Sequence, residues 1–243
     1  MKTFLALLKG FSVVAIGVFI AAAGPEIHSA YLRNYVGSKT VMIKKGRGGG
    51  SGFFVKAPSG ETYILTNRHV CEMSTDGILN VILPGKGRVV QKKIIEKYDA
   101  HDLCLIEGES DYTGLDLASM LYVGQTIAII GHPKLHPLTL SKGEYIGDTV
   151  IKIVTGYNIP KKDCRGKVEQ ANLFLSLFGM KSVCVEEYYS GHITAYSRGG
   201  SSGSPIVNFF GNTVGVLFAG NRMDPFETYI VLLDDVKNFL KDY

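Results

Sequence analysis

The stretch Ser197–Asn208, which reads SRGGSSGSPIVN, carries the strongest signal in the chain. Glycines on both sides of Ser202 let a substrate approach the backbone closely and permit conformations that a Cβ would forbid. A serine in such a turn can present its hydroxyl outward, and neighbouring N–H groups can converge on one point to form an oxyanion hole. The same composition is typical of a Gly/Ser-rich surface loop. Whether the stretch is a nucleophile loop or a plain surface loop therefore depends on the residues upstream.

Length and composition indicate a folded protein. The 243 residues suffice for one or two compact domains, and 46% hydrophobic with 20% charged residues is typical of a globular chain. The net charge of +4 is mild, and no patch interleaves basic with aromatic residues. We therefore expect no nucleic-acid partner.

The N-terminal 30 residues have the pattern of a secretory signal peptide. Lys2 and Lys9 precede an uncharged run over residues 10–24, and cleavage could follow Ala23 or Ala30. As a helix the run spans about 22 Å, less than the ~30 Å hydrocarbon core, which favours a cleaved signal over a retained anchor. The alternatives are membrane attachment through residues 10–24 and, more weakly, a buried helix. In each case we expect the remainder to work outside the cytosol, secreted or periplasmic or membrane-anchored.

The four cysteines show no C-x-x-C spacing, so they indicate neither a zinc nor a redox site. In an exported chain they permit disulfides. We favour a Cys164–Cys184 bridge, which closes one local excursion. Cys71 and Cys104 each lie in an apolar, strand-like setting, which predicts buried free thiols.

From about residue 31 onward the pattern is β, and no helices alternate with the strands. A looser segment, Ser110–Tyr122, separates two halves, residues 31–120 and 121–233. Regularly spaced short strands with Gly/Pro turns favour barrels or sandwiches. The expected strands are Thr40–Lys44, Gly52–Lys56, Thr62–Thr66, Leu79–Leu83, Val89–Tyr98, Asp102–Ile106, Gly124–Pro133, Leu138–Ile146, Thr149–Thr155, His192–Tyr196, Ile206–Phe209, Thr213–Phe218 and Thr228–Leu233.

Two segments depart from the β pattern. Apolar residues at helical spacing predict a short helix or ordered insertion over Lys167–Met180, and an amphipathic helix over residues 234–243. The excursion at about residues 161–187 contains a basic run, which is typical of a solvated loop. The functional alternative is a lid or a contact with an anionic surface near the cleft, supported by Phe174, Leu175, Leu177 and Phe178.

His69, Asp102 and Ser202 together suggest nucleophilic catalysis. A serine hydroxyl needs an adjacent base, and histidine suits that role because its pKa lies near working pH. A buried aspartate fixes the tautomer of the histidine and stabilises the imidazolium. Asp99 competes with Asp102, which we prefer because it directly precedes an apolar strand. His132 and His136 could suggest a metal pair, but the flanking prolines favour a turn, so we expect no metal.

The contexts of these residues resemble chymotrypsin-type serine proteases, which share the order His, Asp, Ser. Leu65–Val70 and Asp102–Ile106 resemble the histidine and aspartate segments of HtrA-type enzymes, and Gly124–Pro133 resembles their first strand of the second barrel. Gly199–Pro205 is similar to the nucleophile loop of glutamyl-endopeptidase-like enzymes. The resemblance implies an all-β fold of two antiparallel six-stranded Greek-key barrels with a C-terminal helix, and an oxyanion hole formed by the N–H groups of Gly200 and Ser202.

Ser201 competes with Ser202, because Gly199–Gly203 also matches the nucleophile elbow of α/β-hydrolases. That fold places the serine before its acid and histidine, and no histidine follows Ser201. By resemblance, Ser201 replaces the aspartate that pairs with a freed N-terminus in many trypsin-like enzymes, so activation by such a pairing is not expected. Leu217 replaces the histidine of the glutamyl-specific group.

The resemblance implies a pocket formed by Val214–Gly220. Tyr196, Phe218, Ala219 and Gly220 then suggest an apolar or small pocket without a charge selector. No segment follows the terminal helix, so no PDZ module is expected. The implied activity is serine endopeptidase cleavage of polypeptides through an acyl-enzyme, with no cofactor. The rivals are a silent binding protein on the same fold and an esterase using the same triad.

Overall fold

The computed structural model describes residues 24–85, 87–221 and 223–243. The expected signal or anchor segment lies largely outside these residues. Residues 24–35 are helical, and a 3₁₀ turn, η1 (Gly37–Lys39), leads into the first strand. Among the described helices, none combines the length and apolar content needed to span a bilayer.

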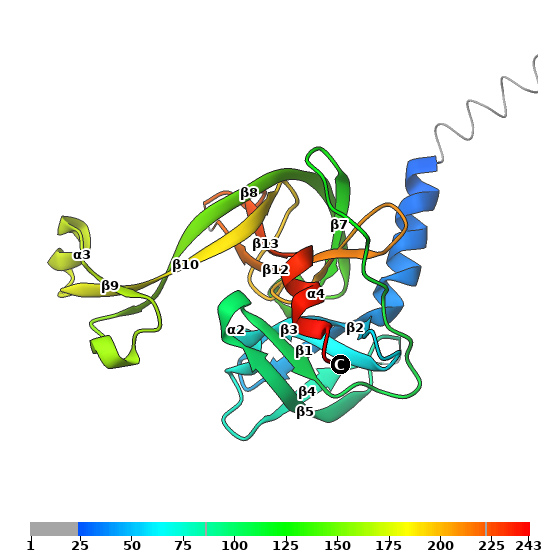
Figure 1. Ribbon diagram of the computed structural model, residues 1–243, viewed down its shortest axis with the longest axis horizontal. Helices are drawn as coiled ribbons and strands as arrows, with labels where there is room; N and C mark the ends of the chain where they lie inside the picture. Colours follow the sequence, from blue (N-terminus) through cyan, green and yellow to red (C-terminus); the bar gives the residue numbers. More distant parts are fainter. Residues whose placement is uncertain (1–23, 86, 222) are drawn as a thin grey trace, which may run out of the picture.

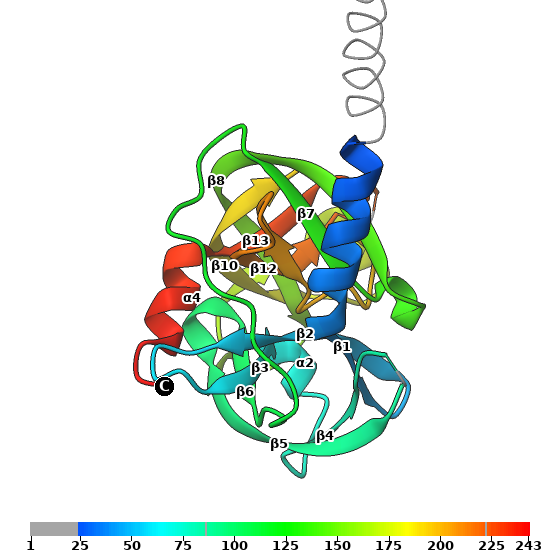
Figure 2. The ribbon, with the colours of Figure 1, turned by 90° about the vertical axis from the view of Figure 1, so that its right-hand side faces the viewer.

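The helix over residues 24–35 corrects the prediction that β structure begins at about residue 31. Leu32 and Val36, four residues apart, are buried on one face of this segment. His28 stacks on Phe209 at 3.9 Å between ring centroids, and its Nε2 lies 2.8 Å from the Phe209 carbonyl oxygen. The helix therefore packs along the second barrel, as Figure 2 shows.

The first barrel is closed and antiparallel, with strand order β1-β2-β3-β6-β5-β4. Pairing of β1 with β4 closes the ring, with Met42 opposite Ile82. Its elements are β1 (Thr40–Lys45), β2 (Gly48–Lys56), β3 (Thr62–Asn67), α2 (Arg68–Cys71), β4 (Ile78–Ile82), β5 (Val89–Tyr98), η2 (Asp99–His101) and β6 (Leu103–Ile106).

The second barrel contains six antiparallel strands in the order β13-β12-β11-β7-β8-β10, and pairing of β10 with β13 closes it. A further strand, β9, extends the sheet from β10. The elements are β7 (Thr126–Gly131), η3 (Pro133–Leu135), β8 (Thr139–Tyr157), η4 (Lys161–Asp163), β9 (Lys167–Gln170), α3 (Leu173–Leu177), β10 (Ser182–Ile193), β11 (Pro205–Val207), β12 (Thr213–Gly220), β13 (Thr228–Leu232) and α4 (Leu233–Leu240). The expected two-barrel architecture and terminal helix are confirmed.

Three apolar cores hold the molecule together. One lies inside each barrel, and the third lies between the barrels and includes Phe53, Leu105, Ile130 and Phe239. The connecting segment between β6 and β7 is anchored, because buried Leu115 exchanges backbone hydrogen bonds with the end of β2. The cores fix the two barrels against each other and so position the cleft between them.

The strands β8 and β10 continue beyond the barrel as a long hairpin (Figure 1). The two runs expected at Leu138–Ile146 and Thr149–Thr155 form one strand, because β10 pairs with β8 past Gly147. We call residues 150–189 the arm. The expected helix over Lys167–Met180 is wrong for its first part, which forms β9. Only Leu173–Leu177 is helical, because Lys167–Gln170 pair with β10 instead.

The prediction of free thiols at Cys71 and Cys104 is wrong, since the two form a disulfide. Cys104 lies on β6, beside β3, and the helical turn α2 carries Cys71 back over β6. The sequence pattern could not show this return of the chain. The expected Cys164–Cys184 bridge is confirmed.

Candidate active site

His69 and Asp102 meet because β3 and β6 are paired neighbours. His69 lies in α2, directly after β3, and Asp102 directly precedes β6, where Asn67 is opposite Leu103. The Asp102 carboxylate accepts two hydrogen bonds from one residue, from the His69 backbone N–H at 3.0 Å and from its ring Nδ1 at 2.7 Å. This double contact fixes the imidazole plane and leaves Nε2 free of Asp102.

Asp102 is held in an unusual backbone conformation, with φ 52° and ψ 42°. Aspartate is among the residues that tolerate this left-handed region. The Asp102 carbonyl accepts hydrogen bonds from the Arg68 N–H at 3.0 Å and from Asn67 Nδ2 at 3.1 Å. These contacts hold the backbone of Asp102, and its buried carboxylate meets His69 away from bulk water.

Asp99, the competing acid, contacts Arg68 and not His69. Its carboxylate is exposed and lies 3.3 Å from Arg68 Nη1. Arg68 itself is buried and also contacts Asp102, with Nε 3.7 Å from Oδ1.

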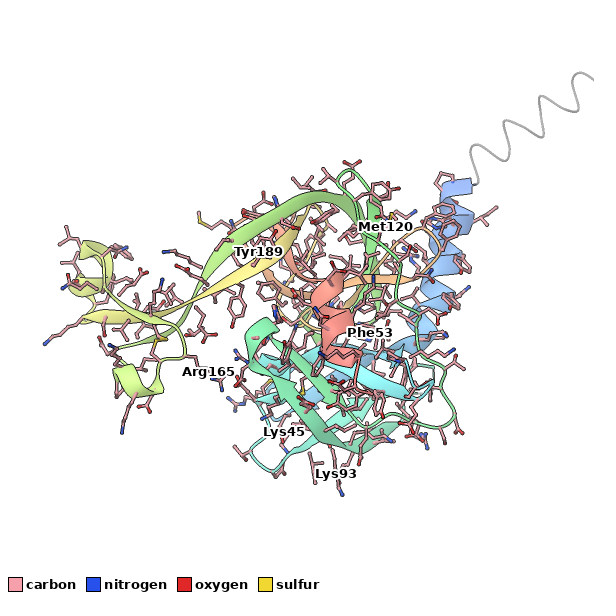
Figure 3. The ribbon with its side chains drawn as sticks, viewed as in Figure 1. Lys45, Phe53, Lys93, Met120, Arg165 and Tyr189 are labelled. Atoms are coloured by element: carbon pink, nitrogen blue, oxygen red, sulfur yellow. A yellow bond between two sulfur atoms is a disulfide. The ribbon has the colours of Figure 1, made fainter. Side chains whose placement is uncertain are left out.

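Arg68 links the histidine segment to the arm. Its Nη2 lies 3.4 Å from Glu186 Oε2 and 3.2 Å from the Tyr188 hydroxyl, both on β10. Burial and a hydrogen bond to Glu186 raise the pKa of Tyr188, so this hydroxyl stays protonated and donates. Figure 3 shows Arg165 reaching from the arm toward the first barrel, where it pairs with Glu72 at 2.6 Å. Sequence reasoning missed this network, because its partners across the arm and the first barrel are 93 to 120 residues apart.

The glycine-rich stretch forms a tight turn. The Ser201 N–H donates to the Arg198 carbonyl at 2.9 Å, and Gly200, with φ +90°, is its third residue. Of the two central residues of the turn, only the second has a positive φ. This pattern is that of a type II turn, and it favours glycine at the second position. No described residue accepts a backbone hydrogen bond from the Gly200 or Ser202 N–H, the two amides on either side of Ser201.

The turn is fastened to the first barrel through Ser51 on β2. The Ser51 N–H donates to the Ser202 carbonyl at 2.7 Å, and its hydroxyl donates to the Gly200 carbonyl at 2.9 Å. Gly203 permits this approach, because a Cβ there would lie 2.0 Å from the Ser51 carbonyl oxygen. The closeness of the two chains therefore requires glycine.

A cleft of about 850 Å³ brings His69, Asp102 and Ser202 together. His69 and Ser202 both belong to the residues that the structure describes, and no hydrogen bond joins the Ser202 hydroxyl to the His69 imidazole. Ser201 is buried and its hydroxyl faces the Arg198 N–H, which distinguishes it from Ser202 at the cleft.

The expected pocket residues Phe218, Ala219 and Gly220 line this cleft, together with Leu217 and Ser197. Tyr196 does not line it. Its ring packs against Phe226, and its hydroxyl accepts from Arg198 Nε at 3.3 Å. Sequence reasoning missed Ser197, whose buried hydroxyl lies 2.7 Å from that of Thr228.

His132 and His136 do not form a pair of ligands. His132 Nδ1 lies 3.0 Å from the backbone carbonyl of His136, in the turn that the prolines predict. In residues 24–85, 87–221 and 223–243, no three His, Cys, Asp or Glu side chains are grouped to hold a metal.

This geometry belongs to the chymotrypsin-like class of two-barrel hydrolases, with the cleft between the barrels. A family model, the trypsin-like peptidase domain, matches residues 50–216. The chain therefore belongs to the trypsin-like peptidase family and is a serine-type endopeptidase.

Solved structures show the same fold at low identity. The Rv3671c protease of M. tuberculosis in its active form is 15% identical with a TM-score of 0.65, covering 88% of this chain and 84% of that one. The serine endoprotease of Yersinia pestis is 15% identical with a TM-score of 0.61, covering 87% and 64%. Deg5 is 23% identical with a TM-score of 0.58, covering 88% and 92%. No curated protein matches the chain.

Proposed function

We propose that the chain cleaves polypeptides through an acyl-enzyme, with Ser202 as nucleophile, His69 as general base and Asp102 as the orienting acid. The double hydrogen bond from the Asp102 carboxylate to His69, at the wall of the cleft that Ser202 also lines, carries this proposal. Catalytic hydrogen bonds often tighten only when substrate binds, so the Ser202 hydroxyl would approach Nε2 in the complex.

In the first step, Ser202 Oγ attacks the scissile carbonyl carbon and its proton passes to His69 Nε2. The imidazolium that forms is stabilised by Asp102, and it then returns the proton to the leaving amine. Water, activated by the same nitrogen, hydrolyses the ester. The N–H groups of Gly200 and Ser202, left free by the type II turn, would bind the oxyanion.

The substrate side of the proposal rests on the lining of the cleft. Phe218, Ala219 and Gly220 offer apolar and backbone surface. Gly220 borders the buried Ser197 hydroxyl, and a Cβ at position 220 would lie 2.6 Å from that oxygen. A pocket with this lining favours a small uncharged side chain before the scissile bond. Tyr196 would act only indirectly, through its contact with Arg198.

A fluorophosphonate probe tests the nucleophile. We expect it to label the wild-type chain and Ser201→Ala but not Ser202→Ala, which should also lose at least about 10⁴-fold in kcat. An unlabelled wild-type chain would support the silent binding protein. Equal labelling after Ser202→Ala would remove Ser202 from the mechanism.

Turnover of a peptide library against simple esters separates the endopeptidase from an esterase. We expect cleavage within peptides, with a preference for small uncharged residues before the scissile bond. Hydrolysis of esters alone would contradict the proposal.

We place the activity outside the cytosol. Two disulfides, Cys71–Cys104 and Cys164–Cys184, support an oxidising compartment. The charge and apolar pattern of residues 1–23 supports export, and those residues lie outside the described part of the chain.

A further inference from the structure

In Figure 1 the end of the arm, residues 158–182, projects from the second barrel with β9 and α3 at its far end, while Arg165 within it pairs with Glu72 of the first barrel. We call this part the arm tip. It contains η4, β9 and α3. Its base continues into the cleft, whose lining includes Ile153, Thr155 and Ile159.

The arm tip exposes large apolar side chains. Leu173, Phe174, Leu177 and Phe178 are 82%, 66%, 77% and 66% exposed, and α3 contains no buried residue. Leu173 and Leu177, like Phe174 and Phe178, are four residues apart, so the four side chains lie on one side of α3 and form one continuous apolar end. Exposed clusters of this kind mark interaction surfaces.

The backbone around α3 is fixed, so the apolar residues are presented by a defined scaffold. Asn172 caps the helix by accepting from the Leu175 N–H at 2.9 Å. Asn158 holds the other side, donating to the Gly179 carbonyl at 3.1 Å and accepting from the Lys181 N–H at 2.7 Å. The Cys164–Cys184 disulfide and the β9–β10 pairing close the scaffold behind it.

The arm tip is also basic. It contains five basic residues (Lys161, Lys162, Arg165, Lys167 and Lys181) and two acidic residues (Asp163 and Glu169), a net charge of +3. All seven are exposed. Lys161, Lys162 and Lys181 form no ion pair with a described residue, so their charges are available to an external anionic surface.

We propose that the arm tip docks on an anionic lipid surface, with Leu173, Phe174, Leu177 and Phe178 entering the headgroup boundary and the lysines contacting lipid phosphates. Amphipathic segments with Leu and Phe beside Lys or Arg bind in this way. The apolar end lies at the extremity of a protruding hairpin (Figure 1). This shape suits insertion into a soft, flat surface and gives a protein partner little area to cover.

Docking would hold the cleft close to the lipid surface, because the same two strands form the arm and line the cleft. The inference does not depend on the proposed catalytic residues, and its test requires no turnover. It also does not depend on residues 1–23, because its readout is local to the tip.

The chain contains no tryptophan, so a single introduced tryptophan reports on its own surroundings. We would place it in the full chain as Phe174→Trp, with Val89→Trp as the control. Val89 is 60% exposed and lies on β5 in the first barrel. Vesicles of phosphatidylglycerol with phosphatidylcholine should shift the emission of the Phe174→Trp chain to the blue, and brominated lipids should quench it. The Val89→Trp chain should show neither change, even if residues 1–23 attach the protein to the vesicle.

Removing Lys161 and Lys162 by substitution with alanine in the Phe174→Trp chain should raise the lipid concentration for the half-maximal shift about fivefold for each lysine. An unchanged emission with phosphatidylglycerol, or equal changes at both tryptophans, would overturn the proposal. A blue shift that depends on protein concentration without lipid would identify a second copy as the occupant instead. Phe178→Trp repeats the measurement if the first variant does not fold.

Discussion

At the scale of single residues, the most consequential side chain outside the proposed triad is Arg68. Buried beside the Asp102 carboxylate, it also contacts Glu186 and Tyr188 on the arm. Its hydrogen bonds to Asp99 and Glu186 hold the surrounding carboxylates in place. We therefore assign Arg68 a positioning role, acting through Asp102.

We expect Arg68→Gln to destabilise the fold by about 3–5 kcal/mol, because the buried Asp102 carboxylate loses the guanidinium beside it. Loss of the guanidinium should also loosen the Asp102 carboxylate that orients His69, so kcat should fall with little change in KM. Denaturant unfolding and steady-state kinetics measure the two effects. Arg165→Gln, at a half-exposed pair with Glu72, is the control and should leave kcat unchanged. A lower stability with an unchanged kcat would reduce Arg68 to a structural role.

His132 predicts a pH dependence of stability. Burial lowers its pKa below the ordinary value of 6.5, against a smaller opposing effect of the His136 carbonyl. Below pH 6.5 the unfolded chain therefore binds more protons at this residue than the folded chain does. The free energy of unfolding should fall as the pH decreases from 6.5 to below the lowered pKa of the folded state. His132→Gln should lessen this loss in urea unfolding across that interval. The control is His136→Gln at the exposed neighbouring histidine, which should retain the loss of stability. Equal stability profiles for wild type and His132→Gln would contradict the prediction.

At the scale of elements, the disulfide between α2 and β6 fastens the segment that carries His69. It joins residues 33 apart in the sequence, and a closed loop of this size corresponds to about 3–4 kcal/mol in the chain-entropy model. Replacing Cys71 and Cys104 together by alanine should lower the free energy of unfolding by that amount.

Thiol titration of the denatured, unreduced chain should find no free thiol among the four cysteines. The matched control replaces Cys164 and Cys184 by serine, which loosens only the arm and should affect global unfolding less. Two titratable thiols in the wild-type chain would restore the interpretation drawn from the sequence.

At the scale of the whole molecule, the core between the barrels decides whether they unfold together. Phe239 of α4 stacks on Tyr98 of β5, with ring centroids 5.2 Å apart, so the C-terminal helix bridges the two barrels. We expect Phe239→Ala to cost about 3–5 kcal/mol and to lower the midpoint of one cooperative transition. Lys241→Ala, on the exposed side, should change little. Separate transitions of the two barrels in the wild-type chain would contradict this account.

The order and spacing of residues within the sequence were enough to predict a β fold, the terminal helix and the candidate residues His69, Asp102 and Ser202. The two barrels were predicted from the resemblance of these motifs to chymotrypsin-type proteases. Period-two patterns with Gly/Pro turns indicate strands, and a glycine with positive φ, such as Gly200, is chosen by local backbone geometry. Both are local properties that neighbouring residues in the chain determine. The preference for Asp102 over Asp99 also rested on a local cue, the strand that follows it.

Only the tertiary structure decided which distant residues meet. The Cys71–Cys104 bridge, the Arg68–Glu186–Tyr188 network and the displacement of Tyr196 from the cleft all depend on how separate strands are placed. The apolar spacing over Lys167–Met180 predicted a longer helix, but pairing with β10 made its first part a strand. Apolar spacing indicates which side chains of a segment share one face. Whether that face is buried depends on which other elements of the fold pack against it. At the arm tip the fold places no described residue over α3, and its apolar residues face outward.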